Sequence, residues 1–195
     1  MSKNSGKRRV RASSVDARAR RTRLALAEAL MTLAPRVGAD RLDVRRLVAM
    51  AGVGRSTFYK HYADKDDFFI TSFGGMVATF DARAREHRAD YDTMLPAREV
   101  FAHVEGARAF ALSLASSGQF ARTQAAREDK LRAVADANLR RVHPAWPNAR
   151  RHELAVVLAS AFAGLMRWWI EAGLRRSASH VAALYESVAR RLLAA

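Results

Sequence analysis

Two short helical segments joined by a glycine-containing turn constrain the fold of this chain more than any other feature. Asp43 is a good N-cap for a helix over residues 44–51. Gly52-Val53-Gly54 then leaves room only for a tight turn before a second short helix over residues 55–62. Each segment needs its neighbours to cover its apolar side. The pattern predicts a helix-turn-helix motif.

The rest of the sequence predicts further helices. Apolar residues recur at helical spacing, the period-2 alternation of strands is missing, and only 10 Gly and 4 Pro interrupt the chain. Further helices are expected over 16–37, 64–88, one or two between 96 and 118, and over 121–142, 150–172 and from about 177. We therefore expect an all-α chain of about nine helices, with a disordered arm (1–14), a helix-turn-helix domain (15–65) and a second helical domain (66–195).

Basic residues are concentrated near the N-terminus. The chain has 34 Lys+Arg and 19 Asp+Glu, a net charge of +15, and residues 1–65 hold sixteen of the basic but only five of the acidic residues. A polyanion is the expected partner of this region, because basic side chains displace the counterions around it. Residues 1–14 would follow a phosphate backbone or enter a minor groove, or they would serve only as a solubilising tail. Charge alone does not distinguish nucleic acid from an anionic membrane.

Several classes of protein are disfavoured by what the sequence lacks. It has no Cys, its six His are scattered, and it contains no nucleotide-binding or nucleophile motif. We expect no enzyme activity, no metal and no cofactor. The longest uncharged apolar run, Leu154 to Met166, is 13 residues, short of the ~20 that span a bilayer. With no convincing targeting segment, we expect a soluble, cytoplasmic protein.

The stretch Ala51 to Tyr62, with Asp64 and Lys65, resembles the DNA-binding domain of the TetR family of bacterial transcriptional regulators. The similarity runs from Leu26 to about Phe69 and includes the string T-F-Y-x-H-Y-x-x-K. Two departures concern the end of the first helix, where the family usually has a bulky aromatic in place of Ala34 and no proline at Pro35. The resemblance implies a homodimeric transcriptional regulator of double-stranded DNA, most often a repressor that a small molecule releases from a palindromic operator.

Residue chemistry supports a DNA-contacting role for the second short helix. Arg55 can donate two hydrogen bonds to guanine, and Thr57 can contact a thymine methyl group or a phosphate. By the resemblance, Tyr59, His61 and Lys65 hold phosphates. Gly54 suits either close approach to DNA or merely a tight turn, and Lys60 is a phosphate contact or a solvated charge. The predicted DNA-binding residues are Arg45, Gly54, Arg55, Ser56, Thr57, Tyr59, Lys60, His61 and Lys65.

The segment 154–166 is apolar almost all round, so one side of it needs a partner beyond its own domain. Its small residues would let another helix approach closely. Together with the last helix it resembles the family's dimer interface, a bundle of two helices from each subunit. The residues predicted for this interface are Ala155, Ala159, Ala163, Gly164, Leu184, Val188 and Leu192.

The resemblance also implies a small-molecule pocket in the second domain. Its candidate lining is Phe101, Val104, Phe110, Leu114, Phe120, Phe162, Met166 and Trp169. The simpler interpretation is that these residues are core. A constitutive, ligand-independent DNA-binding dimer of the same fold is the nearest alternative. A membrane binder is disfavoured, because the apolar faces of the short helices are needed for each other.

Overall fold

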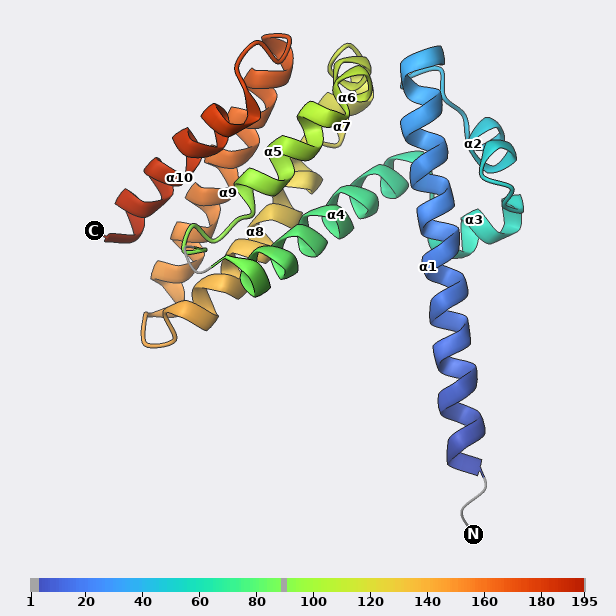
Figure 1. Cartoon of the computed structure of the whole chain (residues 1–195), viewed down its shortest axis with the longest axis horizontal. Helices are drawn as coiled ribbons and strands as arrows, with labels where there is room; N and C mark the ends of the chain where they lie inside the picture. The colour runs from blue at the N-terminus through green and yellow to red at the C-terminus, as the bar shows by residue number, and fades with distance from the viewer. Residues whose placement is uncertain (1–3, 89–90, 195) are drawn as a thin grey trace.

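The computed structural model describes the backbone of residues 4–88 and 91–194 and the side chains from residue 17 onward (Figure 1). This part of the chain contains ten helices and no strand, which confirms the all-α prediction. The helices are α1 (Asn4–Val37), α2 (Val44–Met50), α3 (Arg55–His61), α4 (Lys65–His87), α5 (Ala97–Gly106), α6 (Arg108–Ala115), α7 (Gly118–Arg122), α8 (Gln124–Val142), α9 (Asn148–Glu171) and α10 (Ala178–Ala194). In Figure 1, α1 to α3 stand at one end, α10 lies at the other, and α4 connects the two parts.

A first hydrophobic core joins α1, α2, α3 and the start of α4. At its centre the Phe58 ring lies 5.3 Å from the Tyr62 ring and 5.8 Å from the Phe68 ring, between centroids. Burial raises the pKa of the Tyr62 hydroxyl. The buried members are Leu26, Ala29, Leu30, Ala34, Ala39, Leu42, Leu47, Val48, Phe58, Tyr62, Phe68 and Phe69. Because two of them belong to α4, this core continues past the expected domain boundary at residue 65.

Helix α1 is longer than the sequence pattern indicated. It begins at Asn4, so residues 4–14 are helical rather than the disordered arm expected there, and residues 1–3 lie outside the described part of the chain. The segment contains three Arg, one Lys and one Ala, which favour helix, and it continues a helix that the first core already holds further along the chain. Pro35 is exposed in the last turn, and the helix ends at Gly38, whose φ is +83°.

The departure from the usual TetR sequence at Ala34 has a structural consequence. Ala34 is fully buried, and its carbonyl accepts a hydrogen bond from the Ser113 hydroxyl of α6 at 2.6 Å. A bulky aromatic side chain occupies more space than a methyl group, so the small residue at this position suits the close approach of α6 to the end of α1. The end of α1 and α6 are thus in direct contact here.

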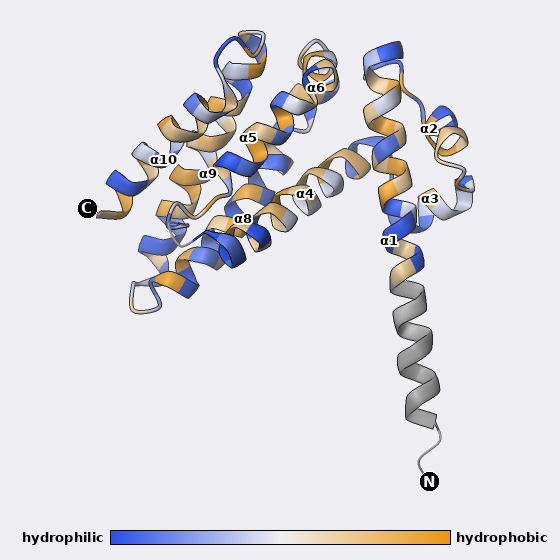
Figure 2. Ribbon diagram, viewed as in Figure 1, coloured by the Kyte–Doolittle hydropathy of each residue, from blue (hydrophilic) through white to orange (hydrophobic). Residues whose placement is uncertain are grey.

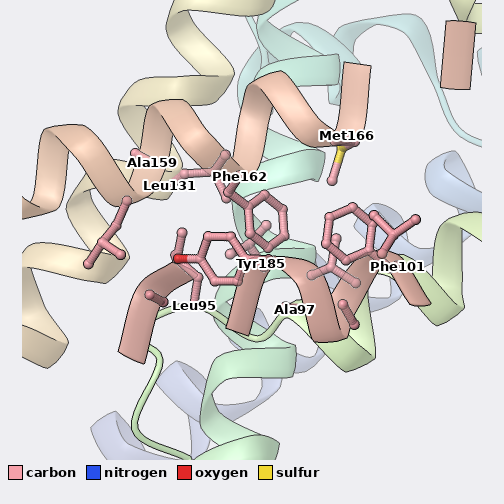
Figure 3. Packing of buried hydrophobic residues seen from close by; sticks show 14 of the residues in the cluster. Leu95, Ala97, Phe101, Leu131, Ala159, Phe162, Met166 and Tyr185 are labelled. Carbon is pink, nitrogen blue, oxygen red and sulfur yellow. The ribbon is translucent and has the colours of Figure 1, made fainter. Parts of the chain in front are cut away.

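A second, larger core fills the space among α4, α5, α8, α9 and α10. Figure 3 shows Phe101, Phe162 and Tyr185 gathered at its centre. The Phe101 and Phe162 rings stack with centroids 4.9 Å apart, while Trp169 meets Phe101 at 5.6 Å and Tyr185 meets Phe162 at 5.1 Å. Hydrophobic and hydrophilic residues alternate along α4, α8 and α10 (Figure 2), as expected of helices that cover a core on one side.

Helix α9 is the most apolar of the long helices. By length and composition alone it meets the criterion for a membrane span, although its sequence contains no uncharged run of that length. A core helix of a soluble protein meets the same criterion, and α9 packs against α8, α10 and α6 and contributes Phe162 and Trp169 to the second core. The span criterion is therefore weak evidence for a membrane location.

The region 118–124 differs from the sequence expectation. Gly118, expected to end a helix, begins the short helix α7, and Thr123 separates α7 from α8. The cause is a tertiary contact: the Asp40 carboxylate accepts hydrogen bonds from the backbone N–H groups of Gly118 (3.0 Å) and Gln119 (3.3 Å). An acidic group from the α1–α2 connection therefore satisfies the start of α7, as an N-cap does within one helix.

A buried carboxylate ties α10 to the far end of α4 and to α5. Glu186 is 2% exposed. Its oxygens accept hydrogen bonds from Arg88 at 2.9 Å, from Arg98 at 2.8 Å and from Arg190 at 3.4 Å. Because the charge is both paired and hydrogen-bonded, its burial is tolerated.

Candidate DNA-binding surface

The geometry of the α2–α3 turn follows from a few backbone contacts. The Asp43 carboxylate caps α2 by accepting the Arg46 N–H at 2.7 Å. Gly52, just past α2, has φ +62°, a conformation that favours glycine. The Val53 N–H then returns to the Val48 carbonyl at 3.0 Å. These contacts fix the direction in which α3 leaves the turn.

Gly54, the N-cap of α3, is not explained by the turn. Its φ is −67°, which any residue adopts, and an added Cβ would meet only Thr57 Oγ1 at 3.6 Å and Ser56 Oγ at 3.9 Å. Those are ordinary van der Waals separations. The tight-turn explanation therefore belongs to Gly52, and close approach of another molecule remains the prediction for Gly54.

Helix α3 separates its residues into an inner and an outer side. Phe58 is fully buried and Tyr62, just after the helix, is 3% exposed. The guanidinium of Arg55 lies 5.9 Å from the ring centre of Tyr59, which is 47% exposed. Arg45, Gly54, Arg55, Ser56, Tyr59 and Lys60 are exposed, and Thr57 and His61 are half-buried. We call these eight residues the recognition surface.

The charge on α3 suits a polyanion. Its first turn carries no acidic residue, and Lys60 and His61 stand in its last turn. With Arg55 at the start, every ionisable group of the helix other than Tyr59 is basic. A helix of this kind presents hydrogen-bond donors along one side, as major-groove readers do.

Lys65 has a role that the sequence did not reveal. Its ammonium donates to the carbonyl oxygens of Ala39 at 3.2 Å and Asp40 at 3.4 Å, and so holds the start of α4 against the α1–α2 connection. An ammonium has three N–H donors, which leaves one for a phosphate. The partners lie 25 and 26 residues earlier in the chain, and no local spacing indicates such a contact. The phosphate role stays a prediction.

A hollow in the second domain lies among α4, α7, α8 and α9. It leaves about 10 Å³ for the centre of a water-sized molecule, which is room for roughly one water. Its lining is Phe73, Phe120, Gln124, Arg127, Glu128, Leu131, Ala163, Met166 and Arg167. We call it the Arg127 hollow.

Most of the residues predicted to line a ligand pocket lie elsewhere. Only Phe120 and Met166 of that set line the Arg127 hollow. Phe101, Phe162 and Trp169 are fully buried in the second core, where they pack on one another rather than around a space. Helical spacing indicates burial equally for core and for pocket residues, so the sequence could not separate them.

The other three predicted pocket residues have different surroundings. Phe110 stacks on Phe69 of α4 with centroids 6.3 Å apart and so packs against the first core. Leu114 is partly buried against both cores, and Val104 is half-buried against the second. Phe110 and Leu114 therefore belong to the contact between the two parts of the chain.

The residues predicted for a dimer interface divide into two groups. Ala155 and Ala159 are 0% and 1% exposed within one subunit, so they are not available to a second copy. Leu184 and Val188 of α10 are 46% and 41% exposed. Gly164 has open space where a Cβ would stand. Ala163, Gly164 and Leu192 are half-buried, and Ala163 also lines the Arg127 hollow.

An exposed apolar surface exists on α9 and α10, although it is not the one that the small residues suggested. Five of the nine exposed large hydrophobic residues in the described part of the chain lie on these two helices. They are Val156, Val157, Trp168, Leu184 and Val188. We call them the α9–α10 face. The sequence pointed to the small residues of α9, but the tertiary structure turns Ala155 and Ala159 inward.

No group of three or more His, Asp or Glu side chains is placed to hold a metal ion within the residues described. The recognition surface instead presents basic and hydroxyl side chains.

Comparison with known proteins also finds the helix-turn-helix domain that the sequence predicts. Residues 26–71 match the family model described as bacterial regulatory proteins, tetR family. A search of curated proteins finds no match.

Solved structures resemble most of the chain. A TetR transcriptional regulator from Streptococcus agalactiae 2603V aligns with a TM-score of 0.51 and 20% identity, covering 91% of this chain and 98% of that one. A TetR transcriptional regulator from Rhodococcus sp. RHA1 aligns with a TM-score of 0.59 and 14% identity, covering 89% of this chain and 96% of that one. The transcriptional regulator FadR from Bacillus subtilis, solved in complex with stearoyl-CoA, aligns with a TM-score of 0.54 and 15% identity, covering 87% of this chain and 96% of that one.

At these identities the structural likeness concerns the fold, while the match over 26–71 concerns the sequence of the helix-turn-helix domain itself. Regulators of this kind bind DNA and are not enzymes. The domain match shows that residues 26–71 form a helix-turn-helix domain of the kind found in bacterial regulatory proteins of the tetR family, and the solved structures show that the chain shares the fold of such regulators. DNA-binding regulation is the role that this domain supports.

Proposed function

We propose that the protein is a cytoplasmic homodimeric repressor that binds a palindromic operator and is released from it by a small molecule. The proposal of DNA binding rests on how α3 divides its side chains between core and surface. Phe58 is buried in the first core, while Arg55, Ser56 and Tyr59 are exposed. Arg55 and Thr57 read base edges, and Tyr59, Lys60, His61 and Lys65 hold the phosphate backbone.

The homodimer rests on the α9–α10 face. Large apolar side chains concentrated on two neighbouring helices are typical of a surface that is covered in the functional assembly. Figure 1 places α10 at the end of the molecule opposite α2 and α3. A two-fold pairing there leaves both recognition surfaces free for successive major grooves, which lie roughly 34 Å apart.

Release by a small molecule is supported by the position of the Arg127 hollow. The hollow adjoins α4, the helix that contributes to both cores, and α7, which contacts Asp40 in the α1–α2 connection. FadR of Bacillus subtilis has a similar fold and was solved with stearoyl-CoA. A ligand that prefers a different packing around the hollow would shift the population away from the DNA-binding arrangement.

A constitutive DNA-binding dimer is the second candidate, and one observation favours it. The hollow has space for little more than one water in this structure, so a larger ligand must displace side chains before it can bind. Screening of small molecules against the protein bound to its operator separates the two candidates. If some compound lowers the affinity for the operator, the repressor is ligand-controlled, and if none does, it is constitutive.

The DNA-binding roles can be tested by two substitutions on α3, after an operator has been selected from a random duplex library. Arg55→Ala should weaken binding to the selected operator by about 1–3 kcal/mol per half-site and leave a scrambled duplex almost unaffected. Lys60→Ala should weaken binding to both duplexes equally and lower the salt dependence by about one counterion per subunit. Titrations at several salt concentrations provide both quantities.

Equal losses on both duplexes for Arg55→Ala would contradict the proposed division between base reading and phosphate contact. Lys60 suits this comparison better than Lys65, because the Lys65 ammonium also holds the start of α4 and its removal would mix two effects. Arg83, exposed on the outer part of α4, provides a matched control: Arg83→Ala should bind both duplexes as the wild type does.

A further inference from the structure

Arg127 of α8 is a mostly buried cation whose partners are all neutral. Its Nη2 donates to the carbonyl of Phe120 at 2.8 Å, and its Nε donates to Thr123 Oγ1 at 3.3 Å. Among residues 17–88 and 91–194, no carboxylate oxygen lies within 4.0 Å of the guanidinium. Burial lowers the pKa of Arg127 to about 10, so the group is still charged at neutral pH.

Two aromatic rings hold the guanidinium in place. Its central carbon lies 4.0 Å from the centre of the Phe120 ring and 5.6 Å from that of Phe73. A guanidinium stacked in this way is pre-organised, and the two hydrogen bonds described leave other N–H groups of its five for a further acceptor. Buried charges usually have a charged partner. Arg127 therefore provides a fixed anion-binding group that no carboxylate of the described residues neutralises.

The rest of the hollow adds positive charge and an apolar wall. Arg167 lines the hollow and donates to Gln124 Oε1 at 3.2 Å, while the Glu128 carboxylate accepts a hydrogen bond from Ser160. Two cations and one anion thus face the same space. The apolar lining consists of Phe73, Phe120, Leu131, Ala163 and Met166.

We infer that the Arg127 hollow binds an organic anion, a carboxylate joined to an apolar body, and that the guanidinium of Arg127 pairs with the carboxylate. Arginine suits this ligand because its planar fork matches the two oxygens of a carboxylate. The apolar body displaces Phe73 or Met166 from its present position, since the hollow as it stands has room for roughly one water.

The inference deepens the proposed ligand control, and the contacts of α7 show how the anion would act. The guanidinium now holds the Phe120 carbonyl in α7. The same helix holds the DNA-binding part: its first two N–H groups bind Asp40, and Gln119 Nε2 donates to Asp66 at 2.8 Å. A carboxylate competes with the Phe120 carbonyl for the guanidinium and so weakens the hold of Arg127 on α7.

The polar contacts between α7 and the helix-turn-helix part are not all satisfied. Gln119 Oε1 is buried without a hydrogen-bond partner in the described structure, and Arg122 meets Asp66 only at 3.5 Å. An unsatisfied buried acceptor makes the docked arrangement less favourable. Beside the apolar contacts of Phe110 and Leu114, these polar contacts through Asp40 and Asp66 are the part of the interface that a change in α7 would alter.

The test compares ligands of equal chain length on the full-length protein by isothermal titration calorimetry. Decanoate is expected to bind at least about tenfold more tightly than decanol, and decyltrimethylammonium more weakly than either, because only the carboxylate gains a charge-assisted hydrogen bond. Equal affinities for decanoate and decanol, or no binding of decanoate up to its solubility limit, would overturn the inference. This comparison needs no variant, so it does not depend on a substituted protein folding.

Substitutions then assign the effect to one side chain. Arg127→Met should lower the affinity for decanoate about tenfold or more without changing that for decanol, and Arg127→Lys should retain part of the difference. Arg132→Met, on the same helix but in an exposed pair with Asp129, is the matched control and should bind both compounds as the wild type does. Undiminished binding of decanoate to a folded Arg127→Met would overturn the assignment.

Titration of the protein on its operator keeps this inference separate from the proposed function. If decanoate binds through Arg127 but leaves the affinity for the operator unchanged, the result supports the anion site and contradicts the proposed ligand control. If only cationic or neutral compounds release the operator while decanoate does not bind, the result supports ligand control and contradicts the anion site.

Discussion

Replacing Glu186 with alanine is expected to lower the free energy of unfolding by about 3–5 kcal/mol, a range typical of breaking a buried ion pair. The carboxylate is 2% exposed and receives hydrogen bonds from Arg88, Arg98 and Arg190. Its loss removes the buried acceptor that three arginines share, although Arg88 keeps Glu99 at 3.3 Å and Arg190 keeps Asp92 at 3.1 Å. The Arg88 side chain is affected most, because it is 12% exposed and cannot turn freely to solvent.

The measurement is a thermal or urea denaturation followed by circular dichroism at a fixed protein concentration, since dimer formation makes stability depend on concentration. For a chain of this size the expected loss corresponds to a fall in Tm of roughly 6–20 °C. Asp129→Ala is the matched control. Its ion pair with Arg132 is largely exposed, so it should cost at most about 1 kcal/mol.

Glu186→Gln separates charge from packing. It keeps the size of the side chain and one hydrogen-bond acceptor. Its free energy of unfolding should therefore lie between those of the wild type and the alanine variant. If Glu186→Ala costs no more than Asp129→Ala, the carboxylate is not the centre of the α4–α5–α10 contact that its geometry indicates.

The double substitution Leu184→Glu and Val188→Glu is expected to give a monomer that binds a two-half-site operator about 100-fold more weakly or worse, because the second half-site is no longer engaged by the same molecule. Both side chains are more than 40% exposed on α10. Their replacement should therefore leave the fold of one subunit intact while placing four negative charges in the proposed two-fold interface.

Light scattering at micromolar concentration gives the mass, circular dichroism checks the helical content, and titrations on duplexes with one or two half-sites give the affinities. Val142→Glu, an exposed valine at the end of α8, is the control for adding a charge to an apolar surface residue. A double variant that remains a dimer and binds as the wild type does would show that the subunits pair through another surface.

The sequence by itself determined the helical fold class and the helix-turn-helix motif. Local signals were sufficient there: Asp43 caps α2, Gly52 takes a positive φ after it, and Phe58 and Tyr62 share one side at a spacing of four. Such features depend on residues within a few positions of each other, which is the range that helical periodicity and capping rules describe.

Helical periodicity and capping rules do not predict contacts between residues far apart in the chain. Asp40 begins α7 from 78 positions away, and Glu186 pairs with arginines 88 and 98 positions earlier. The same limit applies to Phe101 and Trp169: a helical stripe shows that a side chain turns inward, but not whether it meets another side chain or a space.

Only the tertiary structure decided which apolar residues stay exposed and which charges are left without a partner. Ala155 and Ala159 turn inward while Leu184 and Val188 remain at the surface. Among the described residues, Arg127 lies against two aromatic rings and donates only to neutral acceptors. The physical reason is that exposure and charge pairing are set by how whole helices pack around the two cores. The hydrophobic pattern of one helix fixes which side turns inward, but not which neighbour covers it.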